Sequence, residues 1–130
     1  MTILIIAGQD IRELSVGLSK DGAIVETRTI VSSPETYLRD VAQALGDWTI
    51  ALDDLNAVAV VTGPGSFTSS RVSVMIANGI AFAKGIPVIG IPNVERADFA
   101  SLTIPTTLPP VDQFAVPIYD RPPHITSPTP

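Results

Sequence analysis

Residues 61–71, with the sequence VTGPGSFTSSR, decide the fold of this chain. They follow a short apolar run and precede a long apolar segment with helical spacing, so they predict a strand, a tight glycine turn and the start of a helix. Gly63 and Gly65 permit backbone angles that residues with side chains avoid. Ser66 or Thr68 can cap the helix by accepting bonds from its free amides, and such a helix start favours anions.

The segments around this stretch have the composition of strands. Asp21 and Gly22 predict a hairpin turn between two of them. The first segment is continuously aliphatic, which is typical of a strand that is buried on both faces. The predicted strands are residues 2–7, 13–18, 23–31, 57–61 and 88–91.

Two helices are predicted between these strands. Ser33 and Pro34 suit the N-cap and first position of a helix that Gly46 ends. The second helix spans residues 66–84 and stops at Gly85. It is apolar nearly all round, so we expect it to be covered on two sides.

A row of small side chains on the second helix predicts a contact with another helix. Residues at four-residue spacing share a helix face, and small ones permit close approach. We expect the contacted helix to belong to a partner protein, with packing inside the same domain as the alternative. The predicted interface residues are Tyr37, Val41, Trp48, Ser69, Ser73, Ala77 and Ala81.

Length and charge limit the function classes. A chain of 130 residues predicts one domain with a genuine core. The net charge is −5 and no basic stripe is present, which argues against strong direct binding of nucleic acid. Cysteine is absent, which excludes disulfides and thiolate metal sites. The apolar start is too short for a signal sequence, and no run has the length of a membrane span, so a cytoplasmic location is expected.

The glycine stretch resembles the Gly-Pro-Gly-Ser-Phe-Thr-Gly-Leu-Arg signature of the TsaB/YeaZ family. The matching residues are Gly63, Pro64, Gly65, Ser66, Phe67, Thr68 and Arg71, with Ser69 and Ser70 in place of glycine and leucine. Residues 79–87 and 117–123 are also similar to segments of that family. Arg71 matches a signature arginine, which leaves a packing or interface role open beside that of a solvent-facing charge.

The resemblance implies an α/β fold, a single ribonuclease-H-like lobe of the actin-like ATPase superfamily. Such a lobe has a mixed five-stranded sheet with two main helices, here with an extra C-terminal edge strand. We expect the lobe at residues 1–97. Residues 98–113, a low-complexity linker, replace the family's second lobe, and residues 114–130 form the edge strand and a proline-rich tail.

The resemblance also implies a non-catalytic scaffold in the synthesis of tRNA N6-threonylcarbamoyladenosine. The expected partner is the catalytic subunit TsaD, bound through the helix pair, with the ATPase TsaE as a further partner. A homodimer through the same helices is expected for the isolated chain, and contact with tRNA only indirectly. Residues 7–9 read Ala-Gly-Gln where the family has an aspartate-threonine pair, and a single lobe has no cleft for a nucleotide. No cofactor, metal or catalytic residue is therefore expected.

Two other functions remain open: a glycoprotease-like hydrolase and a stand-alone homodimeric interaction module. The glycine stretch lacks the lysine of a Walker phosphate loop, because Phe67 and Thr68 stand there. It also lacks the spacing of a nucleophile elbow, because Pro64 and Thr68 flank Ser66. His124, in the tail, is the only histidine and is not expected to be catalytic.

Overall fold

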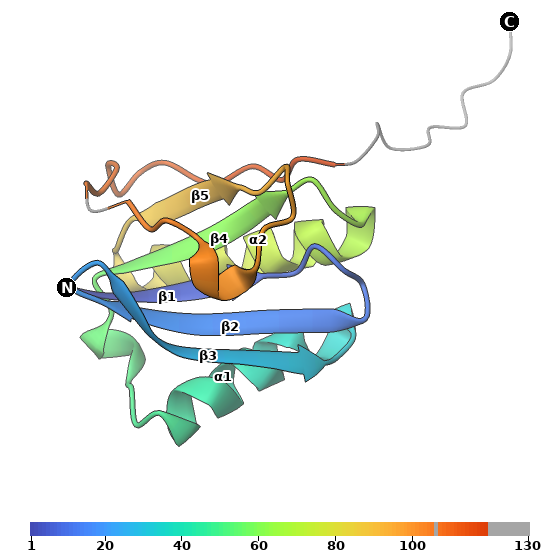
Figure 1. Ribbon diagram of the computed structural model, residues 1–130. Helices are drawn as coiled ribbons and strands as arrows, with labels where there is room; N and C mark the ends of the chain where they lie inside the picture. The colour runs from blue at the N-terminus through green and yellow to red at the C-terminus, as the bar shows by residue number, and fades with distance from the viewer. Residues whose placement is uncertain (106, 120–130) are drawn as a thin grey trace, which may run out of the picture.

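The computed structural model describes residues 1–105 and 107–119 of the chain. These residues form a five-stranded mixed sheet with two main helices, which confirms the predicted fold class (Figure 1). The elements follow the chain as β1 (Thr2–Ala7), β2 (Glu13–Lys20), β3 (Ala23–Val31), η1 (Pro34–Thr36), α1 (Tyr37–Asp47), η2 (Leu52–Asp54), β4 (Ala57–Gly63), α2 (Phe67–Lys84), β5 (Val88–Pro92) and η3 (Phe99–Ser101).

The sheet has the strand order β3-β2-β1-β4-β5. The pairs β1–β2 and β2–β3 are antiparallel, whereas β1, β4 and β5 run parallel to one another. The turn between β2 and β3 lies at Asp21 and Gly22, whose φ angles of 52° and 88° are those of a tight hairpin turn. The three parallel strands end at the same border of the sheet, beside the glycine stretch.

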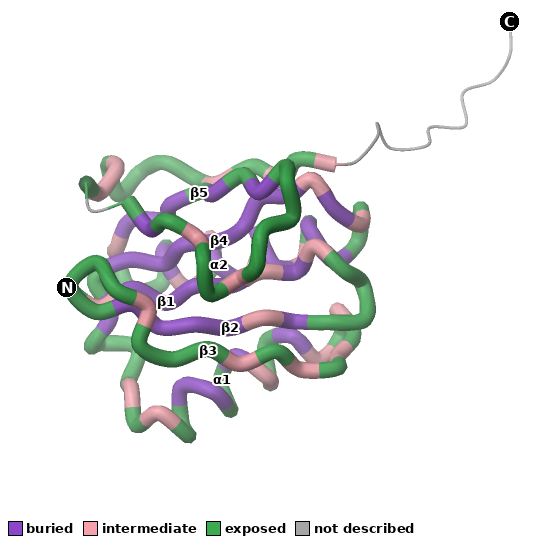
Figure 2. Tube along the Cα trace, viewed as in Figure 1, coloured by how far each residue is buried: buried purple, intermediate pink, exposed green. Residues whose placement is uncertain are grey.

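Both main helices pack on one face of the sheet. Alternate residues of the central strands, such as Leu4, Val16 and Val58, meet Val41 of α1 and Val74 of α2 in one buried cluster. Figure 2 shows the buried residues concentrated along the central strands and on the inner sides of the helices. Among the described residues, no helix has both the length and the apolar character that a membrane span requires.

The helix ends differ in detail from those predicted. Gly85 has a φ of 65° and ends α2 as expected. Gly46 lies inside α1 rather than after it, and α1 is preceded by the 3-10 turn η1. Neither Ser33 nor Ser66 makes a side-chain capping bond. The amide of Ser66 instead donates to the carbonyl oxygen of Gln9, so a tertiary contact positions the start of α2.

The other face of the sheet is covered by residues 99–105 and 107–108, which belong to the segment 98–113 that the sequence predicts to be a linker with little power to fold. Ile104 is buried against Ile5 and Ile89, and Phe99 and Leu102 pack beside it. The linker is therefore part of the core. The sequence analysis missed this packing because the segment is rich in Ser, Thr and Pro. A small number of apolar side chains within it is nevertheless enough to cover one face of a small sheet.

Replacing Ile104 with alanine tests this assignment. The side chain is 6% exposed, so we expect a loss of about 2–4 kcal/mol in the free energy of unfolding, measured with urea. The exposed neighbour Thr103, changed to alanine, is the control and should shift stability by less than about 0.5 kcal/mol. Equal effects of the two changes would show that the segment does not pack on the sheet.

Within residues 114–119, the part of the predicted C-terminal segment that the structure describes, no edge strand forms. Residues 113–119, called the strap below, are extended but make only an isolated bridge between Gly65 and Tyr119. The strap is bonded to α2 and to the end of β4 rather than along the edge of β5. The predicted tail and His124 lie outside the described residues.

Candidate functional site: the glycine loop and the strap

The glycine loop, residues 63–66, lies where the parallel strands β1, β4 and β5 end. In open α/β sheets, the carboxyl ends of the strands are the usual place for ligands. The loop joins β4 to α2, and its peptide bond between Gly63 and Pro64 is cis. Its position makes it the first candidate for a functional site.

Two side-chain amides hold the loop from both sides. Gln9, after β1, donates from Nε2 to the carbonyl oxygens of Pro64 at 2.7 Å and Asn93 at 3.1 Å. Asn93, after β5, donates from Nδ2 to Oε1 of Gln9 at 3.0 Å. Its backbone amide donates to the carbonyl oxygen of Gly63 at 2.8 Å. Asn93 is buried, and its side chain also bonds both backbone groups of Ala97. Directional bonds therefore fix the loop to the neighbouring strand ends.

Close backbone contacts leave no room for a side chain at either glycine of the loop. A Cβ atom on Gly65 would lie 2.6 Å from the carbonyl oxygen of Gln9. A Cβ atom on Gly63 would lie 2.0 Å from the carbonyl oxygen of Ile118 in the strap. The loop is thus packed between Gln9 and the strap, which explains both glycines.

The strap contacts α2 and the end of β4 at three points. The side-chain amide of Asn78, on α2, donates to the carbonyl oxygen of Ala115 at 3.0 Å and accepts from its amide at 2.9 Å. The amide of Ile118 donates to the carbonyl oxygen of Thr62 at 2.7 Å. The ring of Tyr119 stacks on Phe67, at the start of α2, with 4.6 Å between centroids.

Arg71 lies next to Phe67, at the start of α2. Its guanidinium lies 5.7 Å from the centroid of the Phe67 ring, on the exposed side of the helix start. The contact supports a packing role for this residue, one of the three roles left open by the sequence. The ring of Phe67 thus contacts Tyr119 of the strap and also the guanidinium of Arg71.

Two cavities flank the site. One, of about 270 Å³, is lined by Gln9, Asp10, Glu13, Asn93 and Asp98 among others. Asp10 is exposed and accepts a bond from the amide of Arg12, which fits the predicted turn residue. Within residues 1–105 and 107–119, no group of three or more acidic side chains that could hold a metal ion is present.

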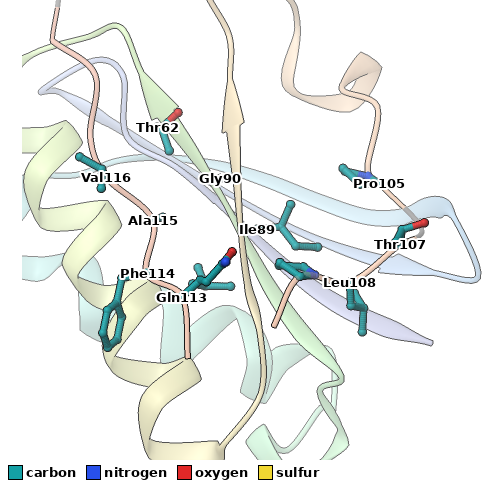
Figure 3. Close-up of a pocket in the computed structure, with 12 residues that line it drawn as sticks. Thr62, Ile89, Gly90, Pro105, Thr107, Leu108, Gln113, Phe114, Ala115 and Val116 are labelled. Carbon is teal, nitrogen blue, oxygen red and sulfur yellow. The ribbon is translucent and has the colours of Figure 1, made fainter. Parts of the chain in front are cut away.

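The larger cavity, of about 510 Å³, lies at β5 between the strap and residues 105 and 107–109. Figure 3 shows Ala115 and Val116 on one side of Gly90, and Leu108 on the other. Most of its described lining residues are apolar, and none of these described residues is ionisable. The lining provides surface for packing but no acid, base or nucleophile.

Most of the residues predicted to form the partner interface are buried inside the chain, so the interface was assigned to the wrong face. Tyr37, Val41, Ser69, Ser73, Ala77 and Ala81 are each 0–4% exposed. The row of small residues faces inward, because close approach of α2 to β1 and α1 needs small side chains: the backbone at Gly8 lies against Ser73 and Tyr37. The alternative interpretation, packing inside the same lobe, is the correct one.

Tyr37 has a structural role in this packing. Its hydroxyl donates to the carbonyl oxygen of Glu13 at 3.0 Å. The carbonyl oxygen of Asp10 is a second acceptor for the same hydroxyl, at 3.3 Å. Burial raises the pKa of its phenol, and the negative charge of Asp10 adds to the rise. Trp48 is half-buried and lies under the guanidinium of Arg28, at 5.5 Å from the ring centroid.

The residues that the helices do expose were missed by the sequence analysis. Leu38 of α1 is 60% exposed, and Met75 and Phe82 of α2 are 61% and 78% exposed. Met75 and Phe82 share a helix face, since they are seven residues apart. The all-round apolar character of α2 was the available signal, but it did not distinguish the outer face from the inner one.

Comparisons with known proteins identify the family. The family model for tRNA N6-adenosine threonylcarbamoyltransferase, TsaD, matches residues 28–111. The protein of that name from Syntrophus aciditrophicus is 32% identical over 90 residues, covering 67% of this chain and 27% of the relative. The one from Ruegeria pomeroyi is 49% identical over 51 residues, covering 39% of this chain and 14% of the relative.

A solved structure supports the YeaZ-type interpretation. YeaZ from Pseudomonas aeruginosa superposes with a TM-score of 0.62 at 27% identity, covering 71% of this chain and 44% of that one. The chain thus spans less than half the length of the relatives and structures that it matches here. Because the family model covers more than half of the chain, this protein belongs to the TsaD family, and its lobe has the fold of YeaZ.

Proposed function

We propose that this chain is a non-catalytic subunit in the synthesis of threonylcarbamoyladenosine in tRNA, and that it acts by binding a TsaD-like catalytic subunit. Family membership supports the pathway. The glycine loop supports a structural role, because its backbone is bonded to Gln9 and Asn93 and pressed against the strap. A loop filled by its own protein positions a helix rather than a substrate.

The observation that carries the proposal is the exposed apolar surface of the helix pair. Leu38, Met75 and Phe82 are large, apolar and more than half exposed. Val72 and Ile76 of α2, which are within three residues of Met75 in the sequence, are half-buried. Large side chains of this kind supply the energy of protein interfaces when a partner removes them from water. These residues replace the small-residue row as the proposed contacts with the catalytic subunit.

The remaining partners follow from the same proposal. The net charge of −5 disfavours direct contact with phosphate, so tRNA is bound through the catalytic subunit. A TsaE-like ATPase is a further partner, and the complex works in the cytoplasm. No observation on the described residues favours the alternative hydrolase.

Met75→Arg tests the interface. A buried arginine without a counter-charge should weaken co-purification with a TsaD homologue about 30-fold or more, the effect of losing one strong interface contact. The variant should also fail to restore the modification in cells that lack their own TsaB, a test that the unaltered chain should pass. Thr103→Arg, on the exposed covering segment of the opposite sheet face, is the matched control and should behave as the unaltered chain.

Two results would contradict the proposal. If the unaltered chain fails to bind a TsaD homologue at micromolar concentration, the chain is not its subunit. If Met75→Arg binds as well as Thr103→Arg, the contact lies elsewhere on the surface. Circular dichroism of both variants shows whether each has kept its fold.

A further inference from the structure

The outer edge of β3 is a long sheet border without a strand beside it. Within the described part of the chain, β3 pairs only with β2, and Figure 1 shows it at the border away from β5. The strand has nine residues and contains neither proline nor glycine. Its Val25 and Val31 are 49% and 92% exposed. An edge of this kind is a template for pairing with another strand.

The register with β2 shows which backbone groups face outward. The amide of Ser32 donates to the carbonyl oxygen of Arg12, so this pair is hydrogen-bonded. Bonded and non-bonded pairs alternate in an antiparallel ladder, so the pairs formed by Ile30, Arg28 and Glu26 are bonded as well. The amides and carbonyls of the residues between them, Thr27 and Thr29, therefore point away from β2.

Charge selects one register for pairing with a second copy. Thr27 is the midpoint of Ala23–Val31, so a two-fold axis there overlaps the two strands over their full length. This register sets Glu26 opposite Arg28 of the second copy, and Arg28 opposite its Glu26. A shift of the axis by one residue sets arginine against arginine or glutamate against glutamate, which is destabilising.

The surroundings of the two charges fit this pairing. Glu26 and Arg28 are two residues apart and lie on the same face of the strand. Arg28 donates to Asp47 at 2.8 Å, and its guanidinium has donors for a second carboxylate. Glu26 is exposed and has no ion-pair partner among the described residues. The shift of register between Leu18 and Ser19 leaves Val25 of β3 without a partner on β2, so the β-bulge lies next to the central residues 26–28 and outside them.

We infer that β3 pairs in antiparallel fashion with β3 of a second copy of this chain, about a two-fold axis through Thr27. The pairing joins two sheets into one and extends the backbone ladder through Thr27 and Thr29. It differs from the homodimer through the helices that the sequence predicts. It also leaves Leu38, Met75 and Phe82 free, so that self-association and partner binding use separate surfaces.

A charge exchange tests the register in the full chain. Glu26→Arg and Arg28→Glu should each raise the dissociation constant of the dimer about ten-fold or more, measured by sedimentation velocity, because each variant sets like charges opposite each other. The double variant restores opposite charges and should recover most of the affinity. Arg39→Glu, a mostly exposed arginine on α1, is the control and should leave the dimer unchanged.

Hydrogen exchange gives a second measurement. The amides of Thr27 and Thr29 should exchange slowly at high protein concentration and quickly on dilution. A chain that stays monomeric to about 100 μM, an affinity too weak for a stable pair, or a dimer that is insensitive to Glu26→Arg, would overturn the inference. So would a dimer that Met75→Arg abolishes, because the helices would then join the copies. The isolated chain suffices, so the result is independent of binding to a catalytic subunit.

Discussion

Replacing Gly63 with alanine is expected to lower the free energy of unfolding by about 3 kcal/mol or more. The residue has a φ of 120°, in a region of backbone angles that L side chains rarely adopt. The added Cβ atom would also lie 2.0 Å from the carbonyl oxygen of Ile118. Backbone cannot yield as the end of a side chain can, so either the loop or the strap has to move.

The strap should show the change first. The amide of Ile118 donates to the carbonyl oxygen of Thr62, the residue before Gly63. This hydrogen bond and the contact of Gly63 with the carbonyl oxygen of Ile118 therefore involve the same short stretch of backbone. Hydrogen exchange at the Ile118 amide should therefore accelerate in Gly63→Ala by more than the change at buried strand amides such as Val60. Urea unfolding gives the accompanying loss of global stability.

Gly79→Ala is the matched control for this substitution. Gly79 is exposed within α2, and an added Cβ atom would meet nothing within 4 Å. Alanine is preferred to glycine inside a helix, so the control should stabilise the chain by about 0.5–1 kcal/mol. If Gly63→Ala is as stable as the unaltered chain, the strap is not held against the loop as the structure places it.

Local sequence patterns predicted the elements of this fold. The aliphatic run of residues 2–7, the Asp21-Gly22 turn and the stop at Gly85 depend on neighbours within a few positions, and all three are confirmed. The glycine turn between β4 and α2 is of the same kind. Such features are predictable because their causes, periodicity and backbone freedom, are visible in short windows.

Contacts between distant residues were not predictable from those windows. Gln9 and Asn93 are 84 residues apart and show no pattern in the sequence, yet they fix the glycine loop. Asn78 is visible in the sequence as a polar interruption of an apolar helix, but nothing pointed to its partner Ala115. The burial of Ile104 likewise depends on a sheet face whose cover the local composition did not reveal.

The small-residue row shows a further limit. Spacing correctly placed Ser69, Ser73, Ala77 and Ala81 on one face of α2, but spacing does not say what the face meets. Small side chains suit an approach to another protein and an approach to the protein's own sheet equally well. The structure resolves this, since all four are buried within the chain.

Replacing Ala77 with arginine is therefore expected to unfold the chain. Ala77 is 0% exposed and belongs to the core cluster with Val41, Val58 and Val74. An arginine there overfills a packed interior and places a charge among apolar side chains without a partner, at a cost of more than about 4 kcal/mol. That loss is comparable to the whole stability of many domains of this size.

Met75→Arg is the comparison that isolates the cause. It adds the same side chain to the same helix two positions away, where the residue is 61% exposed. Circular dichroism and urea unfolding should show a folded Met75→Arg variant and a largely unfolded Ala77→Arg variant. If instead Ala77→Arg is folded and has lost only its binding to other proteins, then the row faces outward and α2 is rotated from the orientation described. The two variants thus decide which face of α2 belongs to the core and which to a partner.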